Sequence, residues 1–156
     1  MFDFSGRSRR SEYWWFVLFT VIIALAAGMI DVLFYRGPML LFGYIVVSVI
    51  IFFPSVSVLT RRLHDTGRSG WLGAPYWAYA LYDIAILLSP FVNMDIFETI
   101  MPSSDNALVA AIMMAAAFVM FIWMFIVFIM TLSDSQAKTN RYGPSPKYGV
   151  IEDTFD

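Results

Sequence analysis

His64 and Asp65 are neighbouring residues whose side chains suit acid–base chemistry. An imidazole titrates near neutral pH, and a carboxylate that accepts its N–H can orient the ring. Successive residues of a helix point about 100 degrees apart, however, so these two side chains need not touch. A lone histidine is more often structural, for example at a helix end, and we favour that role over catalysis. The pair therefore supports an enzymatic function only weakly, and this function is the third of the three hypotheses given below.

A group of basic residues surrounds this pair and could bind an anion. A helix expected to begin near Ser69 would point its unpaired amides and positive dipole at a phosphate, and two nearby glycines would allow a small nest of N–H groups. The alternative is that the arginines only set membrane topology and attract lipid headgroups, at about 1 kcal/mol each. The residues expected to bind an anion or a lipid headgroup are Arg7, Arg10, Arg61, Arg62, His64, Arg68, Ser69 and Arg141.

Asp83 is the one acid well inside a long apolar stretch. A carboxylate in hydrocarbon is costly and usually faces a bundle interior or water, which makes it a functional-site hypothesis by default. Counting about 1.5 Å per residue places Asp83 in the outer half of its stretch, within reach of Arg36 or a neighbouring tyrosine. A paired or neutral, hydrogen-bonded Asp83 is the simpler interpretation, and a proton relay is the alternative.

Four apolar stretches must position these residues. Hydrophobic residues make up 60% of the 156 positions and charged residues only 14%, more apolar surface than a water-soluble fold could bury. Each stretch reaches the roughly 18–20 residues that cross about 30 Å of hydrocarbon, and in lipid such segments must be helical. We expect an all-α polytopic membrane protein, a four-transmembrane-helix bundle in a single domain, with spans at about 13–30, 39–59, 71–88 and 107–132.

The positive charges indicate the orientation. Of the ten Lys and Arg residues, three precede the first span, three lie between the second and third, three follow the fourth, and only Arg36 lies elsewhere. Because short segments rich in Lys and Arg stay in the cytoplasm, both termini should be cytoplasmic. The expected cytoplasmic segments are 1–12, 60–70 and 133–156. Their polar side chains should lie together on one membrane face.

The segment from Arg61 to Trp71 reads Arg-Arg-Leu-His-Asp-x-Gly-x-Ser-Gly-Trp. With this motif the chain resembles an uncharacterised family of small bacterial inner-membrane proteins, classed as a domain of unknown function, over about residues 4–146. Members of that family commonly have a second Trp after the first, where this chain has Leu72, so the role of that ring is open. The resemblance implies a four-helix protein of the bacterial inner (cytoplasmic) membrane and brings no established activity.

Three functions remain in play. The leading hypothesis is a non-enzymatic module that binds anionic lipid or a protein partner through its basic cytoplasmic face. The second is a small oligomeric transporter or channel that uses Asp83, and the third an enzyme acting on lipid headgroups with His64 and Asp65. The chain has no Cys and one His, so we expect no metal and no cofactor, and we expect lipids, another membrane protein or a second copy as partners rather than nucleic acid. Whether Gly6-Arg7-Ser8 and Gly67-Arg68-Ser69 mark an internal repeat stays undecided.

Overall fold

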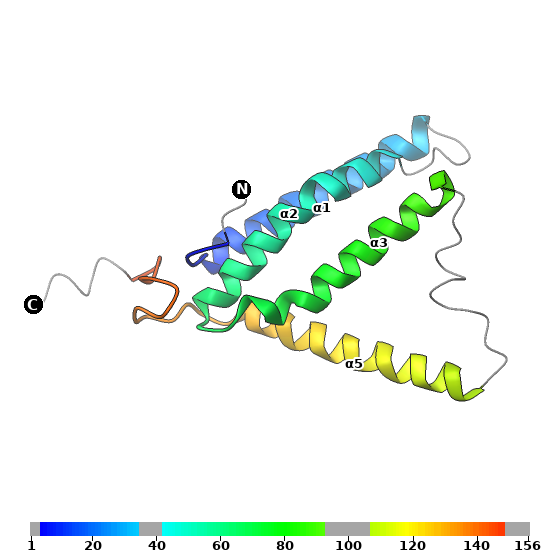
Figure 1. Cartoon of the computed structure of the whole chain (residues 1–156). Helices are drawn as coiled ribbons and strands as arrows, with labels where there is room; N and C mark the ends of the chain where they lie inside the picture. Colours follow the sequence, from blue (N-terminus) through cyan, green and yellow to red (C-terminus); the bar gives the residue numbers. More distant parts are fainter. Residues whose placement is uncertain (1–3, 35–41, 93–106, 149–156) are drawn as a thin grey trace, which may run out of the picture.

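The computed structural model of the protein describes residues 4–34, 42–92 and 107–148, and its long regular elements in these ranges are all helices. Its elements in chain order are α1 (Arg10–Phe34), α2 (Phe42–Asp65), a 3₁₀ turn η2 (Gly70–Gly73), α3 (Ala74–Val92) and α5 (Ala107–Leu132) (Figure 1). The expectation of an all-α fold is confirmed for these residues.

Three of the helices are long and apolar enough to cross a membrane: α1, α2 and residues 108–132 of α5. Only 11%, 28% and 6% of their most apolar windows are buried inside the protein, so their hydrophobic side chains point outward, as a bilayer requires. α3 is a fourth helix of 19 residues. The protein therefore has transmembrane helices, and a membrane crossing by α3 stays a prediction.

All three of the first helices differ from the expected spans by a few residues at each end, and two of these differences affect the polar residues. α2 continues to residue 65 instead of ending near 59, so that the Arg-Arg-Leu-His-Asp sequence is its last turn and a half rather than a loop. α3 begins at Ala74 instead of 71, because Gly70–Gly73 forms a 3₁₀ turn that the Ser69 side chain caps. The chemistry-bearing residues are thus held on a rigid helix end.

The helices gather at one end of the molecule. α1 and α2 run side by side, α3 packs against α2, and α5 approaches the others near its C-terminal end and diverges from α3 toward its start (Figure 1). The small buried core lies at this gathered end. It consists of Leu59, Leu63 and Val127, with Tyr13, Leu72, Tyr76, Trp77 and Met130 packed around them.

Specific polar contacts cap both ends of α2. At its start, the two carboxylate oxygens of Asp31 accept the backbone N–H groups of Gly43 and Tyr44, each at 2.8 Å. At its end, Gly67 takes the left-handed conformation (φ 75°), its N–H donates to the His64 carbonyl, and the next N–H donates to the Leu63 carbonyl, both at 2.9 Å. This pair of bonds is a Schellman cap.

Replacing Gly67 by alanine is expected to destabilise the protein by about 1 kcal/mol, since a side chain disfavours a left-handed backbone. The new Cβ would also lie 2.4 Å from the Gln136 side chain, which must move. Gly28→Ala is the matched control, because Gly28 is helical and its Cβ would meet nothing within 4 Å. Thermal unfolding in detergent should show Gly28→Ala at or above the wild-type Tm, and equal Tm values for both variants would refute the cap.

Candidate functional site at the gathered helix ends

The three polar segments of the chain meet at the gathered end of the helices. The Ser8 N–H donates to the Arg61 carbonyl at 3.1 Å, which joins the N-terminal segment to α2. The Gln136 N–H donates to the Asp65 carbonyl at 3.1 Å, which joins the segment after α5 to the same helix end. Figure 1 shows the blue segment before α1 and the orange segment after α5 near the end of α2. The structure thus brings together segments separated by as many as 137 residues of sequence.

A fully buried carboxylate, that of Asp65, lies at the centre of this arrangement. Arg7 Nε donates to its Oδ1 at 3.0 Å, Arg62 Nη1 donates to its Oδ2 at 2.5 Å, and the Ser135 hydroxyl also donates to Oδ2. The exposed fraction of the side chains is 1% for Arg7 and 0% for Arg62 and Asp65. We call Arg7, Arg62, Asp65 and Ser135 the Asp65 cluster.

Backbone carbonyls complete the hydrogen bonding of the two buried guanidinium groups. Two cations surround one carboxylate, so a positive charge is left over, and dipoles must compensate it in so dry a place. Arg7 donates to the carbonyls of Asp65, Gln136, Lys138 and Gly143. Arg62 donates to those of Ser8, Thr131 and Ser133. The two arginines thereby fasten the N-terminal and C-terminal segments to α2.

Arg7 and Arg62 are structural residues in this arrangement rather than surface groups for an anion. Both were expected to bind an anion or headgroup at the surface, but they are buried and already donate to protein acceptors. Gly67 and Gly70 were the glycines expected to allow a nest of N–H groups for an anion, but the Gly67 N–H caps α2. The Ser69 hydroxyl accepts the Trp71 N–H at 3.4 Å and so belongs to the η2 turn.

The other expected arginines lie at the surface around the cluster. Arg10 and Arg68 are exposed, and Arg61 is partly exposed with Glu12 at 4.0 Å. Arg141 is exposed and lies over the Tyr142 ring, 4.7 Å from its centroid. These groups remain accessible to an anion.

His64 and Asp65 have separate surroundings. The His64 ring stacks on the Tyr142 ring with centroids 3.6 Å apart and planes within 6°. Its Nδ1 lies 3.3 Å from the Gly6 carbonyl oxygen, while Asp65 faces the two arginines. Asp65 therefore does not orient the His64 ring, so an acid–base pair of these two residues is not assembled.

The C-terminal segment supplies contacts that we did not foresee from the sequence. Asn140 Nδ2 donates to the His64 carbonyl at 3.0 Å, and Tyr142 covers the His64 ring. Lys147 Nζ donates to the Asp134 carboxylate at 2.7 Å, and this bond lowers the pKa of Asp134. The sequence from Asn140 to Pro146 contains one glycine and two prolines, which favour a turn, but no local signal in it points to a target on α2.

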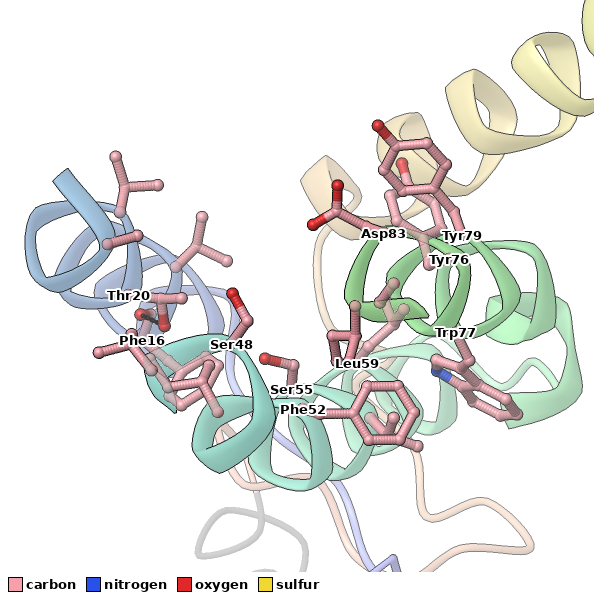
Figure 2. Close-up of a pocket in the computed structure, with 18 of the residues that line it drawn as sticks. Phe16, Thr20, Ser48, Phe52, Ser55, Leu59, Tyr76, Trp77, Tyr79 and Asp83 are labelled. Atoms are coloured by element: carbon pink, nitrogen blue, oxygen red, sulfur yellow. Dashed lines mark hydrogen bonds between the residues drawn. The ribbon is translucent and has the colours of Figure 1, made fainter. Parts of the chain in front are cut away.

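A groove between α1, α2 and α3 is the second feature of interest. Its volume is about 350 Å³, and its walls are mainly apolar and aromatic. Asp83 of α3 lines it with Ser48 of α2, and Figure 2 shows both side chains directed toward the gap between the helices. Arg36, which we expected near Asp83, lies outside the described residues. Within those residues, no group of three His, Asp or Glu side chains could hold a metal ion.

Comparison with known proteins identifies the family of this chain. A family model described as "Protein of unknown function (DUF805)" matches residues 1–144. The chain is 29% identical to "Inner membrane protein YhaI" of Escherichia coli (strain K12) over 147 residues, which cover 94% of this chain and 87% of that protein. It is 34% identical to "Inner membrane protein YhaH" of the same strain over 94 residues, 58% of this chain and 67% of that protein. No solved structure matches the chain.

Proposed function

The chain belongs to the DUF805 family of proteins of unknown function, and on that premise we propose a non-enzymatic inner-membrane module that binds anionic lipid headgroups through a basic cytoplasmic face. The observation that carries the proposal is the division of labour among the arginines. Among the arginines that the structure describes, two are buried in the Asp65 cluster and the others lie around it, exposed or partly exposed.

The proposal includes a membrane topology. We place four spans in the bilayer, α1, α2, α3 and α5, with both termini in the cytoplasm. Support comes from the apolar outer surfaces of three helices, from the length of α3, and from the position of nine of the ten Lys and Arg residues in the three polar segments.

The lipid-binding surface consists of the basic side chains around the Asp65 cluster, without Lys147, whose ammonium bonds the Asp134 carboxylate. Each such charge near an anionic leaflet contributes about 1 kcal/mol. Because the cluster holds the three segments together, these charges act from one rigid face rather than from separate tails. We call this set the basic rim; it comprises Arg9, Arg10, Arg61, Arg68, Lys138 and Arg141.

The experiment is native mass spectrometry of the full chain with phosphatidylglycerol or phosphatidylcholine of identical acyl chains. Wild type should retain the anionic lipid preferentially, and added salt should weaken that preference, since exposed charges are screened over about 8 Å at physiological ionic strength. Arg68→Ala should lower the apparent affinity for phosphatidylglycerol about fivefold, the equivalent of about 1 kcal/mol.

Lys147→Ala is the matched control. This lysine is exposed and basic, but its ammonium is engaged by Asp134 at 2.7 Å, so it should contribute little. Equal retention of the two lipids by wild type, or equal losses in Arg68→Ala and Lys147→Ala, would contradict the proposal. A protein that co-purifies reproducibly and dissociates in Arg68→Ala would instead identify a protein partner for the same face.

The second candidate is a small oligomeric transporter or channel. It is favoured by one observation, the position of Asp83 on the wall of the groove. Its test is ion or solute flux in proteoliposomes, where Asp83→Asn should abolish transport that the wild type supports. Identical flux in the two proteins would remove it.

A further inference from the structure

The groove between the first three helices has the size and lining of a small-molecule site. Its volume of about 350 Å³ lies in the usual range of such sites, about 300–1,000 Å³. Aliphatic and aromatic side chains make most of its surface, among them Phe16, Phe52 and Trp77. Figure 2 shows these side chains arranged around the gap between the ribbons of α1, α2 and α3.

Asp83 lines the groove from the middle of α3. A Cβ on Gly73, the residue directly before α3, would be 3.0 Å from the Leu59 side chain, so the start of α3 lies at the level of Leu59 on α2. Asp83 follows Gly73 by ten residues, about 15 Å along a helix axis. The antiparallel α2 reaches that level about ten residues before Leu59, next to Ser48. If the Leu59 level is near the bilayer boundary, as the expected span ends require, Asp83 lies close to the middle of about 30 Å of hydrocarbon.

The Asp83 carboxyl group faces no basic side chain among the described residues of the groove. Among the described residues that line it, none is Lys, Arg or His, and the structure gives Asp83 no hydrogen bond or ion pair from any residue it describes. A carboxylate at membrane depth is unfavourable without a positive partner. Aromatic faces beside it add attraction for a cation that has shed its water.

We propose that this groove binds a lipophilic monocation, a molecule with one positive charge on a hydrophobic body. The charge lies against Asp83, the Ser48 hydroxyl offers a polar contact beside it, and the apolar walls take the body. The proposal goes beyond headgroup binding at the basic rim and is independent of it, because the ligand has the opposite charge and a different site.

The test measures binding to the purified full chain in a neutral detergent by equilibrium dialysis. The probe is tetraphenylphosphonium, and tetraphenylborate is its counterpart of the same shape and opposite charge. Wild type should bind the cation at least about tenfold more tightly than the anion, and Asp83→Asn should remove that preference, as expected when a low-dielectric ion pair is lost. Asp134→Asn, which removes an exposed carboxylate outside the groove, should leave binding unchanged.

A second pair of variants tests the location without touching any charge. Ala80 lines the groove, and Ala78 is exposed on α3 and does not line it. Ala80→Phe should fill the groove and weaken cation binding, whereas Ala78→Phe should not. Both variants should keep the wild-type Tm within a few degrees, which separates blocked binding from misfolding.

Three results would overturn the proposal. The first is equal binding of cation and anion by wild type, and the second is binding of the cation that survives both Asp83→Asn and Ala80→Phe. The third is binding that is absent in wild type and appears in Arg36→Gln, because that arginine would then already occupy the position of the cation.

Discussion

Asp65→Ala is expected to cost the folded protein about 3–5 kcal/mol, because it leaves two buried guanidinium groups without their carboxylate. Arg7 and Arg62 are at most 1% exposed in their side chains, so neither can recover the loss by turning toward water. The Ser135 hydroxyl loses its acceptor as well. Thermal unfolding and size-exclusion chromatography in mild detergent should show a large drop in Tm and in the yield of monodisperse protein.

The same deletion at an exposed ion pair provides the comparison. Asp134 bonds Lys147 at 2.7 Å, but their side chains are 55% and 43% exposed. Exposed pairs contribute little to stability, so Asp134→Ala should leave the Tm almost unchanged. Similar Tm values for Asp65→Ala and Asp134→Ala would mean that the Asp65 cluster does not hold the three segments together.

Asp31→Ala is expected to destabilise the other end of the α1–α2 pair by about 2 kcal/mol, since two partly buried N–H groups at the start of α2 lose their acceptor. Asp31 is fully buried, and its oxygens lie 2.8 Å from the Gly43 and Tyr44 nitrogens. The side chain therefore acts as a cap supplied by one helix to the next. The measurement is again the Tm in detergent.

Asp31→Asn discriminates a cap from a charge effect. The Asn amide keeps one carbonyl oxygen that can accept an N–H, so Asp31→Asn should have a higher Tm than Asp31→Ala. If only the negative charge of Asp31 mattered, the two variants would have the same Tm. Gly43→Ala provides a second check, because its Cβ would lie 2.8 Å from Asp31 Oδ1 and push the carboxylate away from the amides. An unchanged Tm in Asp31→Ala would contradict the cap.

Helices were predictable from the sequence because the bilayer leaves few alternatives. A run of about 20 apolar residues in lipid must be helical, and α5 (Ala107–Leu132) was expected with these same bounds. The ends of α2 and α3 were less predictable. Apolarity ends near residue 59, but the backbone continues as helix until Gly67 supplies a left-handed cap, and then forms the η2 turn.

The candidate site was predictable as a location but not as a set of bonds. Composition alone cannot separate a buried arginine from a surface one, and the partners of Arg7 are 58 or more residues away in sequence. Asp31 gave no signal either, since it was expected at the edge of a loop and instead lies on α1 against the start of α2. Such long-range pairings depend on helix packing, which local patterns do not contain.

Labelling of single cysteines tests the central claim most directly: that the N-terminal segment, the end of α2 and the segment after α5 form one cytoplasmic face. The chain has no native cysteine, so Ser11→Cys, Arg68→Cys and Ala137→Cys each introduce one exposed thiol. A membrane-impermeant maleimide should leave all three unlabelled in intact spheroplasts and label them after permeabilisation, while Ser103→Cys, in the loop expected outside, should react in both. Labelling of any of the first three in intact spheroplasts would contradict the account.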